Sequence, residues 1–123
     1  MLTVTRYGNK FRQVYYYPDR KAPKHIGSCS VYIMPNKVYE IWSLGLLGRF
    51  RGQGYGKKMV AELVRLYSRY GTVRLYVEKN NERAIHIYTQ AGFRICGEYD
   101  GGTEAWKMEY RGQYPTPAFQ RSA

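Results

Sequence analysis

Apolar residues alternate with polar ones in several short runs of the chain, and in two longer runs they recur every three or four residues. Alternation in runs rich in aromatic and β-branched residues predicts strands. We expect seven of them: Leu2 to Tyr7, Phe11 to Tyr17, Ile26 to Met34, Val38 to Leu47, Val73 to Val77, Phe93 to Tyr99 and Glu104 to Tyr110. Turn residues such as Pro35-Asn36 and Asp100-Gly101-Gly102 separate neighbouring runs, as in hairpins.

The two runs with helical spacing predict amphipathic helices. The first extends from Lys57 to Tyr70 and should end at Gly71. Its apolar face would consist of Met59, Val60, Leu63, Val64, Tyr67 and Tyr70. The second begins after a capping Asn81 and stops at Gly92. Its inner face would hold Ala84, Ile85, Tyr88 and Ala91. The order ββββαβαββ therefore predicts an α+β domain with a mixed central sheet and two main helices.

A length of 123 residues suits one domain with a buried core. We assign residues 1–110 to this domain. The segment from Arg111 to Ala123 has no periodicity and is expected to be a flexible tail or an arm for a partner. Apolar runs are too short to span a membrane, and the N-terminus lacks the pattern of a signal peptide. Cys29 and Cys96 favour a reduced, cytoplasmic protein with two buried thiols.

Basic residues are concentrated in the first half of the chain. The net charge is +11, and residues 1–60 hold 11 basic but only 2 acidic side chains. Such an excess favours an acidic ligand or partner. A solvated basic surface without a binding role is the alternative that composition leaves open.

A glycine-rich loop, Arg51-Gly52-Gln53-Gly54-Tyr55-Gly56-Lys57-Lys58, joins an apolar strand to the first helix. Its glycines allow the backbone N–H groups to approach an anion closely. The first helical turn adds unpaired N–H groups and the positive end of the helix dipole. The pattern predicts a pyrophosphate site. It lacks the Gly-Lys-Ser/Thr ending of a Walker loop and the Gly-x-Gly-x-x-Gly spacing of a dinucleotide loop.

Three ordered motifs resemble those of the GNAT superfamily of acyl-CoA-dependent N-acyltransferases. The first is Arg/Gln-x-x-Gly-x-Gly/Ala, matched by Arg51, Gly54 and Gly56. The second is Asn-x-x-Ala-x-x-x-Tyr followed by Gly-Phe, matched by Asn81, Ala84, Tyr88 and Gly92-Phe93. The third, Tyr39-Glu40-Ile41 ahead of Leu44-Gly45-Leu46, has the spacing of lysine-acetylating members. The resemblance covers residues 26 to 110 and implies direct transfer of an acetyl group from acetyl-CoA to an amine.

By this resemblance, acetyl-CoA would contact three segments of the chain. The strand end at Leu44, Gly45 and Leu46 would pair with the pantetheine arm, and the Leu46 N–H would polarise the thioester carbonyl. Gly45 fits a bulge or a close backbone approach. The expected cofactor-binding residues are Leu44, Gly45, Leu46, Arg51, Gly52, Gln53, Gly54, Tyr55, Gly56, Lys57, Asn81, Ala84 and Tyr88. Lys58 is as well explained by a solvated side chain.

The resemblance also implies two catalytic residues. Tyr88 matches the tyrosine that protonates the leaving CoA thiolate, although a core tyrosine is the alternative. Glu40 matches a glutamate that serves some lysine acetyltransferases as general base. It could equally be a strand-edge carboxylate or orient the charge of the acceptor. Since His25 and His86 have no metal-like spacing, we expect no metal site.

One departure from the family bears on the acceptor. Family members usually place two helices between their first two strands, where this chain has only a turn near Gly8-Asn9. The basic loop from Pro18 to Lys24 could supply part of the missing wall. An open, basic site favours a protein lysine or N-terminal amine in an acidic setting, or an aminoacyl-tRNA. The opposing class is a non-catalytic binder of nucleic acid or of a nucleic-acid-binding protein. A homodimer is also expected by resemblance.

Overall fold

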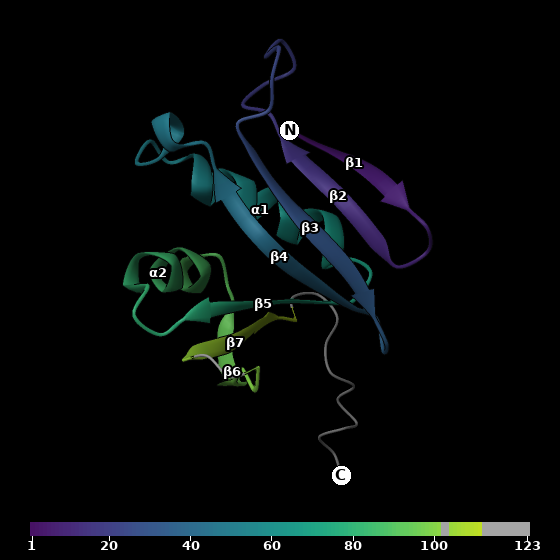
Figure 1. The fold of residues 1–123 in the computed structure, drawn as a ribbon, viewed down its shortest axis with the longest axis vertical. Helices are drawn as coiled ribbons and strands as arrows, with labels where there is room; N and C mark the ends of the chain where they lie inside the picture. Colours follow the sequence, from purple (N-terminus) through teal and green to yellow (C-terminus); the bar gives the residue numbers. More distant parts are fainter. Residues whose placement is uncertain (102–103, 112–123) are drawn as a thin grey trace.

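All of the predicted strands and helices are present, in the predicted order (Figure 1). The computed structural model describes residues 1–101 and 104–111. The elements are β1 (Leu2–Tyr7), β2 (Phe11–Tyr16), β3 (Gly27–Met34), β4 (Val38–Leu46), the 3-10 helix η1 (Gly48–Phe50), α1 (Tyr55–Tyr67), β5 (Thr72–Glu78), α2 (Glu82–Gln90), β6 (Arg94–Glu98) and β7 (Ala105–Tyr110). The α+β class is therefore confirmed. The predicted tail falls, beyond Arg111, outside the described residues, as does Gly102 of the last predicted turn.

The seven strands form one sheet in the order β1-β2-β3-β4-β5-β7-β6. Among the strands that the structure describes, only β4 and β5 pair in parallel, and their register begins at Val38↔Thr72 and ends at Ile41↔Leu75. Both strands continue past this point, β4 to Leu46 and β5 to Glu78. Since they pair no further, they diverge and leave a split between them, open along the far half of β4.

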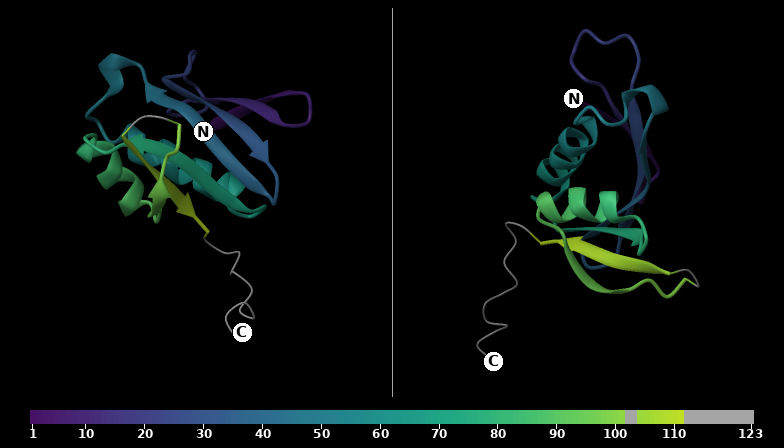
Figure 2. Two further views of the ribbon diagram at one scale, coloured as in Figure 1. Left: turned by 60° about the horizontal axis from the view of Figure 1, so that its bottom comes forward. Right: turned by 90° about the vertical axis from the view of Figure 1, so that its left-hand side faces the viewer.

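Both helices pack on the same face of the sheet (Figure 2). The buried residues of α1 are Met59, Val60, Leu63, Val64 and Tyr67. They belong to one core cluster with strand residues Val14, Tyr16, Cys29, Val31, Ile41, Val73, Leu75, Val77 and Met108. Helix α2 packs Ala84, Ile85, Ile87, Tyr88 and Ala91 against the same cluster. The helical spacing of the sequence thus predicted the buried face of α1 except for Tyr70, and the packed side of α2 except for Ile87.

The other face of the sheet has no helix over it within residues 1–101 and 104–111 (Figure 2). Successive strand residues point to opposite faces. Glu40 and Trp42 therefore flank the core residue Ile41 on this open face, and Tyr76 alternates with core residues of β5. A short turn joins β1 to β2 as a hairpin. This confirms the prediction that no helix lies between these two strands.

Helix α1 begins and ends earlier than predicted. It starts at Tyr55 with Gly54 as N-cap, and Ser68 is its C-cap. Tyr70, predicted on the buried face, is 50% exposed because the chain has already left the helix. Gly71 is therefore not the residue that ends the helix. A Cβ at Gly71 would overlap the backbone carbonyl of Lys37, which shows that glycine is needed there for close packing.

Replacing Gly71 with alanine is expected to lower the free energy of unfolding by about 1–3 kcal/mol, because the added methyl group must push two backbone segments apart. Urea denaturation followed by circular dichroism measures this change. Gly48→Ala is the control, since a Cβ at Gly48 would meet no atom within 4 Å. It should alter stability by less than about 0.5 kcal/mol. Equal losses in both variants would contradict this explanation of Gly71.

The two cysteines, both free, differ in burial. Cys29 is 1% exposed, and burial raises the pKa of its thiol to about 12. Cys96 is exposed, so the prediction of a second buried thiol is wrong. Its strand β6 lies at the edge of the sheet, where one flank has no neighbouring strand among residues 1–101 and 104–111.

Candidate active site

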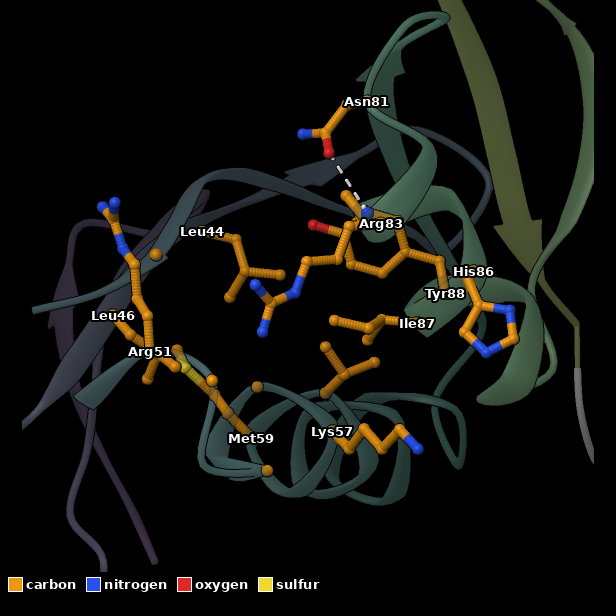
Figure 3. Close-up of a pocket in the computed structure, with 16 residues that line it drawn as sticks. Leu44, Leu46, Arg51, Lys57, Met59, Asn81, Arg83, His86, Ile87 and Tyr88 are labelled. Atoms are coloured by element: carbon orange, nitrogen blue, oxygen red, sulfur yellow. Dashed lines mark hydrogen bonds between the residues drawn. The ribbon is translucent and has the colours of Figure 1, made fainter. Parts of the chain in front are cut away.

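A pocket of about 760 Å³ lies where the end of β4, the start of α1 and the helix α2 meet (Figure 3). Segments far apart in the sequence line it: Leu44, Gly45, Leu46, Arg51, Gly52, Gly54, Gly56, Lys57, Met59, Val60, Asn81, Arg83, Ala84, His86, Ile87 and Tyr88. Eleven of the thirteen expected cofactor-binding residues are in this lining. The structure therefore brings the three predicted segments together around one cavity.

The glycine loop has the backbone that an anion site needs. Gly52 has φ 77° and Gly54 has φ 87°, in the left-handed region that favours glycine. As N-cap of α1, Gly54 offers no side-chain oxygen to the free N–H groups, and the first helical turn contains no acidic residue. An anion in the pocket would therefore meet unpaired donors and the positive end of the dipole.

Two loop residues outside the lining use their side chains elsewhere. Gln53 donates from Nε2 to the Arg49 carbonyl at 2.8 Å. The Tyr55 ring packs against Phe50, and the Lys58 ammonium lies 5.6 Å from the centre of the Tyr55 ring. Lys58 is also absent from the lining, which favours the alternative that it is a surface lysine.

Cations face the pocket from two sides. Arg51 and Lys57 come from the predicted loop, and Arg83, which was not predicted, comes from α2. Figure 3 shows the Arg83 guanidinium pointing into the pocket, and it lies 3.8 Å from where a Cβ on Gly52 would be. The sequence did contain a signal for Arg83. It precedes Ala84 on the helix, and Arg83 and Ile87, spaced i and i+4, form a second row of side chains facing the pocket beside the row of Ala84 and Tyr88.

Helix α2 places Asn81 and Tyr88 on the pocket wall. The Asn81 side chain accepts a hydrogen bond from the Ala84 N–H at 3.1 Å, which confirms the predicted cap (Figure 3). The Tyr88 ring packs against Phe93. Burial raises the pKa of the Tyr88 phenol, and the nearby Cys29 thiol adds to the increase. Tyr88 therefore keeps its proton at neutral pH and can donate it to a group that develops negative charge in the pocket.

The end of β4 presents its backbone to the split. The Leu47 N–H donates to the Ile26 carbonyl at 2.8 Å, on the side of β3. Because successive N–H groups point to opposite edges of a strand, the Leu46 N–H faces the split. A bulge is present, but the residue with positive φ is Ser43, at 56°, and Gly45 pairs regularly with Ser28. The suggestion of a bulge at Gly45 is therefore wrong, while its backbone remains open to the pocket.

Glu40 is not part of the pocket lining. It lies on the open face of the sheet with 7% exposure. Its Oε1 accepts from the Trp42 indole N–H at 2.7 Å. Its Oε2 accepts from the Tyr76 hydroxyl at 3.1 Å and from Arg74 Nη1 at 3.4 Å. The structure thus separates Glu40 from Tyr88, which lies across the sheet.

Residues 1–101 and 104–111 contain no group of three or more His, Cys, Asp or Glu side chains arranged to hold a metal ion. None of the helices in this part of the chain has the length and apolar character needed to cross a bilayer.

A model of the GNAT acetyltransferase family matches residues 5–93. Spermine/spermidine N(1)-acetyltransferase of Bacillus subtilis is 33% identical over 92 residues, covering 71% of this chain and 60% of that protein. N-alpha-acetyltransferase RimI of Mycobacterium tuberculosis is 32% identical over 63 residues, covering 51% of this chain and 39% of that protein. The chain therefore spans less than two thirds of either relative.

Solved structures share the fold at lower identity. A Bacillus subtilis acetyltransferase in complex with CoA has a TM-score of 0.70 and 10% identity, covering 89% of this chain and 96% of that one. An acyl-CoA N-acyltransferase described for Klebsiella pneumoniae has a TM-score of 0.66 and 19% identity, covering 82% and 72% of the two chains.

Proposed function

The chain belongs to the GNAT acetyltransferase family, and on this premise we propose that it transfers an acetyl group from acetyl-CoA to a primary amine on a macromolecule. The observation that carries the proposal is the pocket in which the glycine loop, the end of β4 and Tyr88 meet. The acceptor we favour is a protein lysine or N-terminus in an acidic setting, with aminoacyl-tRNA as the alternative.

The residues around the pocket fit acetyl-CoA. Gly52 and Gly54 have positive φ angles, and because the N-cap Gly54 has no side chain, the first backbone N–H groups of α1 stay uncovered, as a pyrophosphate requires. Arg51, Lys57 and Arg83 would neutralise further phosphate charge. When bound, acetyl-CoA supplies an activated acetyl group. The Leu46 N–H would hold the oxygen of this group, and Tyr88 would donate a proton to the departing sulfur.

The basic loop supports a negatively charged acceptor. Arg20, Lys21 and Lys24 are exposed. This loop leads into β3 beside the end of β4, where Gly27 pairs with Leu46. A polyamine, the acceptor in the name of the Bacillus subtilis relative, would be repelled by a protein of net charge +11. We therefore favour an amine with acidic neighbours.

Reversing Lys21 and Lys24 to glutamate should raise the KM for a lysine peptide with flanking glutamates by about five- to thirty-fold, from roughly 0.5–1 kcal/mol for each exposed charge pair. The dissociation constant of acetyl-CoA should stay within about twofold, because neither lysine lines the pocket. Steady-state kinetics and calorimetry measure the two quantities. Arg65→Glu with Arg69→Glu is the matched control, since Arg65 lies in the last turn of α1, Arg69 lies just beyond it, and both are exposed. An unchanged peptide KM would rule out the loop as the acceptor site.

Glu40 remains a candidate general base, but its bonds to Trp42, Tyr76 and Arg74 favour the role of orienting the acceptor's charge. A cytoplasmic location agrees with the free thiols of both cysteines. Homodimerisation stays a prediction, and light scattering would test it.

A further inference from the structure

Three aromatic rings gather on the open face of the sheet, just beyond the last pairing of β4 with β5. Ring centres are 5.2 Å apart for Trp42 and Tyr76, 4.6 Å for Tyr76 and Tyr99, and 6.0 Å for Trp42 and Tyr99. None of the three belongs to the hydrophobic core cluster, and all are half-buried. The group, which we call the aromatic triad, therefore presents ring surface to solvent beside the split.

A carboxylate lies beside the aromatic triad. Glu40 accepts hydrogen bonds from the Trp42 indole N–H and the Tyr76 hydroxyl. Donating to an anion increases the electron density of a ring, and electron-rich ring faces attract cations more strongly. Arg74 also contacts Glu40 but shares its guanidinium with Glu109, at 2.9 Å. This arrangement favours a positive charge over the triad.

The chain's own cations do not cover these rings in the part of the molecule that the structure describes. The other tryptophan, Trp106, has the Lys79 ammonium 4.2 Å from its ring centre. Lys107 sits opposite Tyr76 in the register, but its Cε lies 3.6 Å from where a Cβ on Gly97 would be, so its side chain extends over β6. The ring faces of the triad are thus left for an external cation.

The geometry points to the aromatic triad as the seat for the ammonium group of the acceptor, with Glu40 orienting its charge. This inference rests on the proposed function. The donor pocket lies on the helix side, so the open face gives the acceptor a separate approach to the split. Tyr99 is held by close packing, since a Cβ on Gly101 would overlap its ring. The acceptor class is therefore a primary ammonium, with any acidic groups farther from the rings.

Tetramethylammonium is a suitable probe because it binds aromatic seats and cannot be acetylated. In Trp106→Phe, Trp42 is the sole tryptophan. Its fluorescence should respond saturably to tetramethylammonium chloride and not to sodium chloride at the same ionic strength. Adding Tyr99→Leu should weaken this binding by about five- to thirty-fold, whereas Tyr99→Phe, which keeps the ring, should leave it unchanged.

The same Tyr99 variants are then compared in acetyl transfer. Tyr99→Leu should raise the KM for the amine by a similar factor, with kcat and acetyl-CoA affinity preserved. A lack of saturable tetramethylammonium binding, or equal binding by Tyr99→Leu and Tyr99→Phe, would overturn the inference even if transfer occurs. If tetramethylammonium binding depends on Tyr99 but the protein transfers no acetyl group, the cation site is supported and the proposed function is refuted. Circular dichroism of each variant checks its folding.

Discussion

Replacing Gly54 with glutamate is expected to raise the dissociation constant of acetyl-CoA by about 100-fold or more. Three effects act together. Gly54 has φ 87°, which a residue with a side chain adopts only under strain. It lines the pocket, and no atom lies within 4 Å of where its Cβ would be, so the carboxylate has room to enter the site. There it would repel phosphates and satisfy the N–H groups that should bind them. Calorimetric titration gives the affinity directly.

The matched control is Gly48→Glu, in the same connection between β4 and α1. Gly48 also has open space around its Cβ position, but it is outside the pocket lining and has no positive φ. Its acetyl-CoA affinity should stay within about threefold of the wild type, as expected for a screened charge at a distance. If both variants bind equally well, the glycine loop is not the phosphate site.

Tyr88→Phe should reduce kcat by about 100-fold or more, while acetyl-CoA affinity changes little. Phenylalanine preserves the packing against Phe93 but has no proton to give. Since burial raises the pKa of Tyr88, the wild-type phenol stays protonated across the neutral range, and kcat should not fall through loss of this proton near pH 7 to 8. Single-turnover and steady-state rates measure the loss.

Tyr67→Phe controls for the removal of any buried hydroxyl. Tyr67 lies on α1, stacks on Tyr39 and does not line the pocket. Its variant should keep a kcat within about threefold of the wild type, because it touches no reacting group. If Tyr88→Phe lowers kcat no more than Tyr67→Phe does, Tyr88 is not the proton donor, and the proton comes from water or from another residue.

Local patterns in the sequence were sufficient for most of the pocket. Tight turns at glycine, a capping asparagine and an apolar helix face are each specified within a few residues, and the structure shows positive φ at Gly52 and Gly54 and the predicted cap at Asn81. Ser43 was missed because serine, unlike glycine or asparagine, gives no local signal for a positive φ. Tyr70 was misplaced because helical spacing continued past the last hydrogen-bonded turn.

Features that depend on strand register could not be predicted from the sequence. Glu40 and Tyr76 are 36 residues apart and meet only because β4 and β5 pair in parallel up to Ile41 and Leu75. The exposure of Cys96 depends on β6 being an edge strand, which follows from β7 inserting between β5 and β6. Long-range pairing of this kind is decided by the whole sheet.

The short parallel pairing of β4 with β5 has a mechanical consequence. The sheet consists of two halves, one formed by β1 to β4 and the other by β5, β7 and β6. These halves are joined by four residue pairs between β4 and β5. A ligand bound in the split would contact both halves of the sheet and add a further link between them. Ligand binding should then couple the local opening motions of the two halves, so that strands without any contact to the ligand also become more rigid.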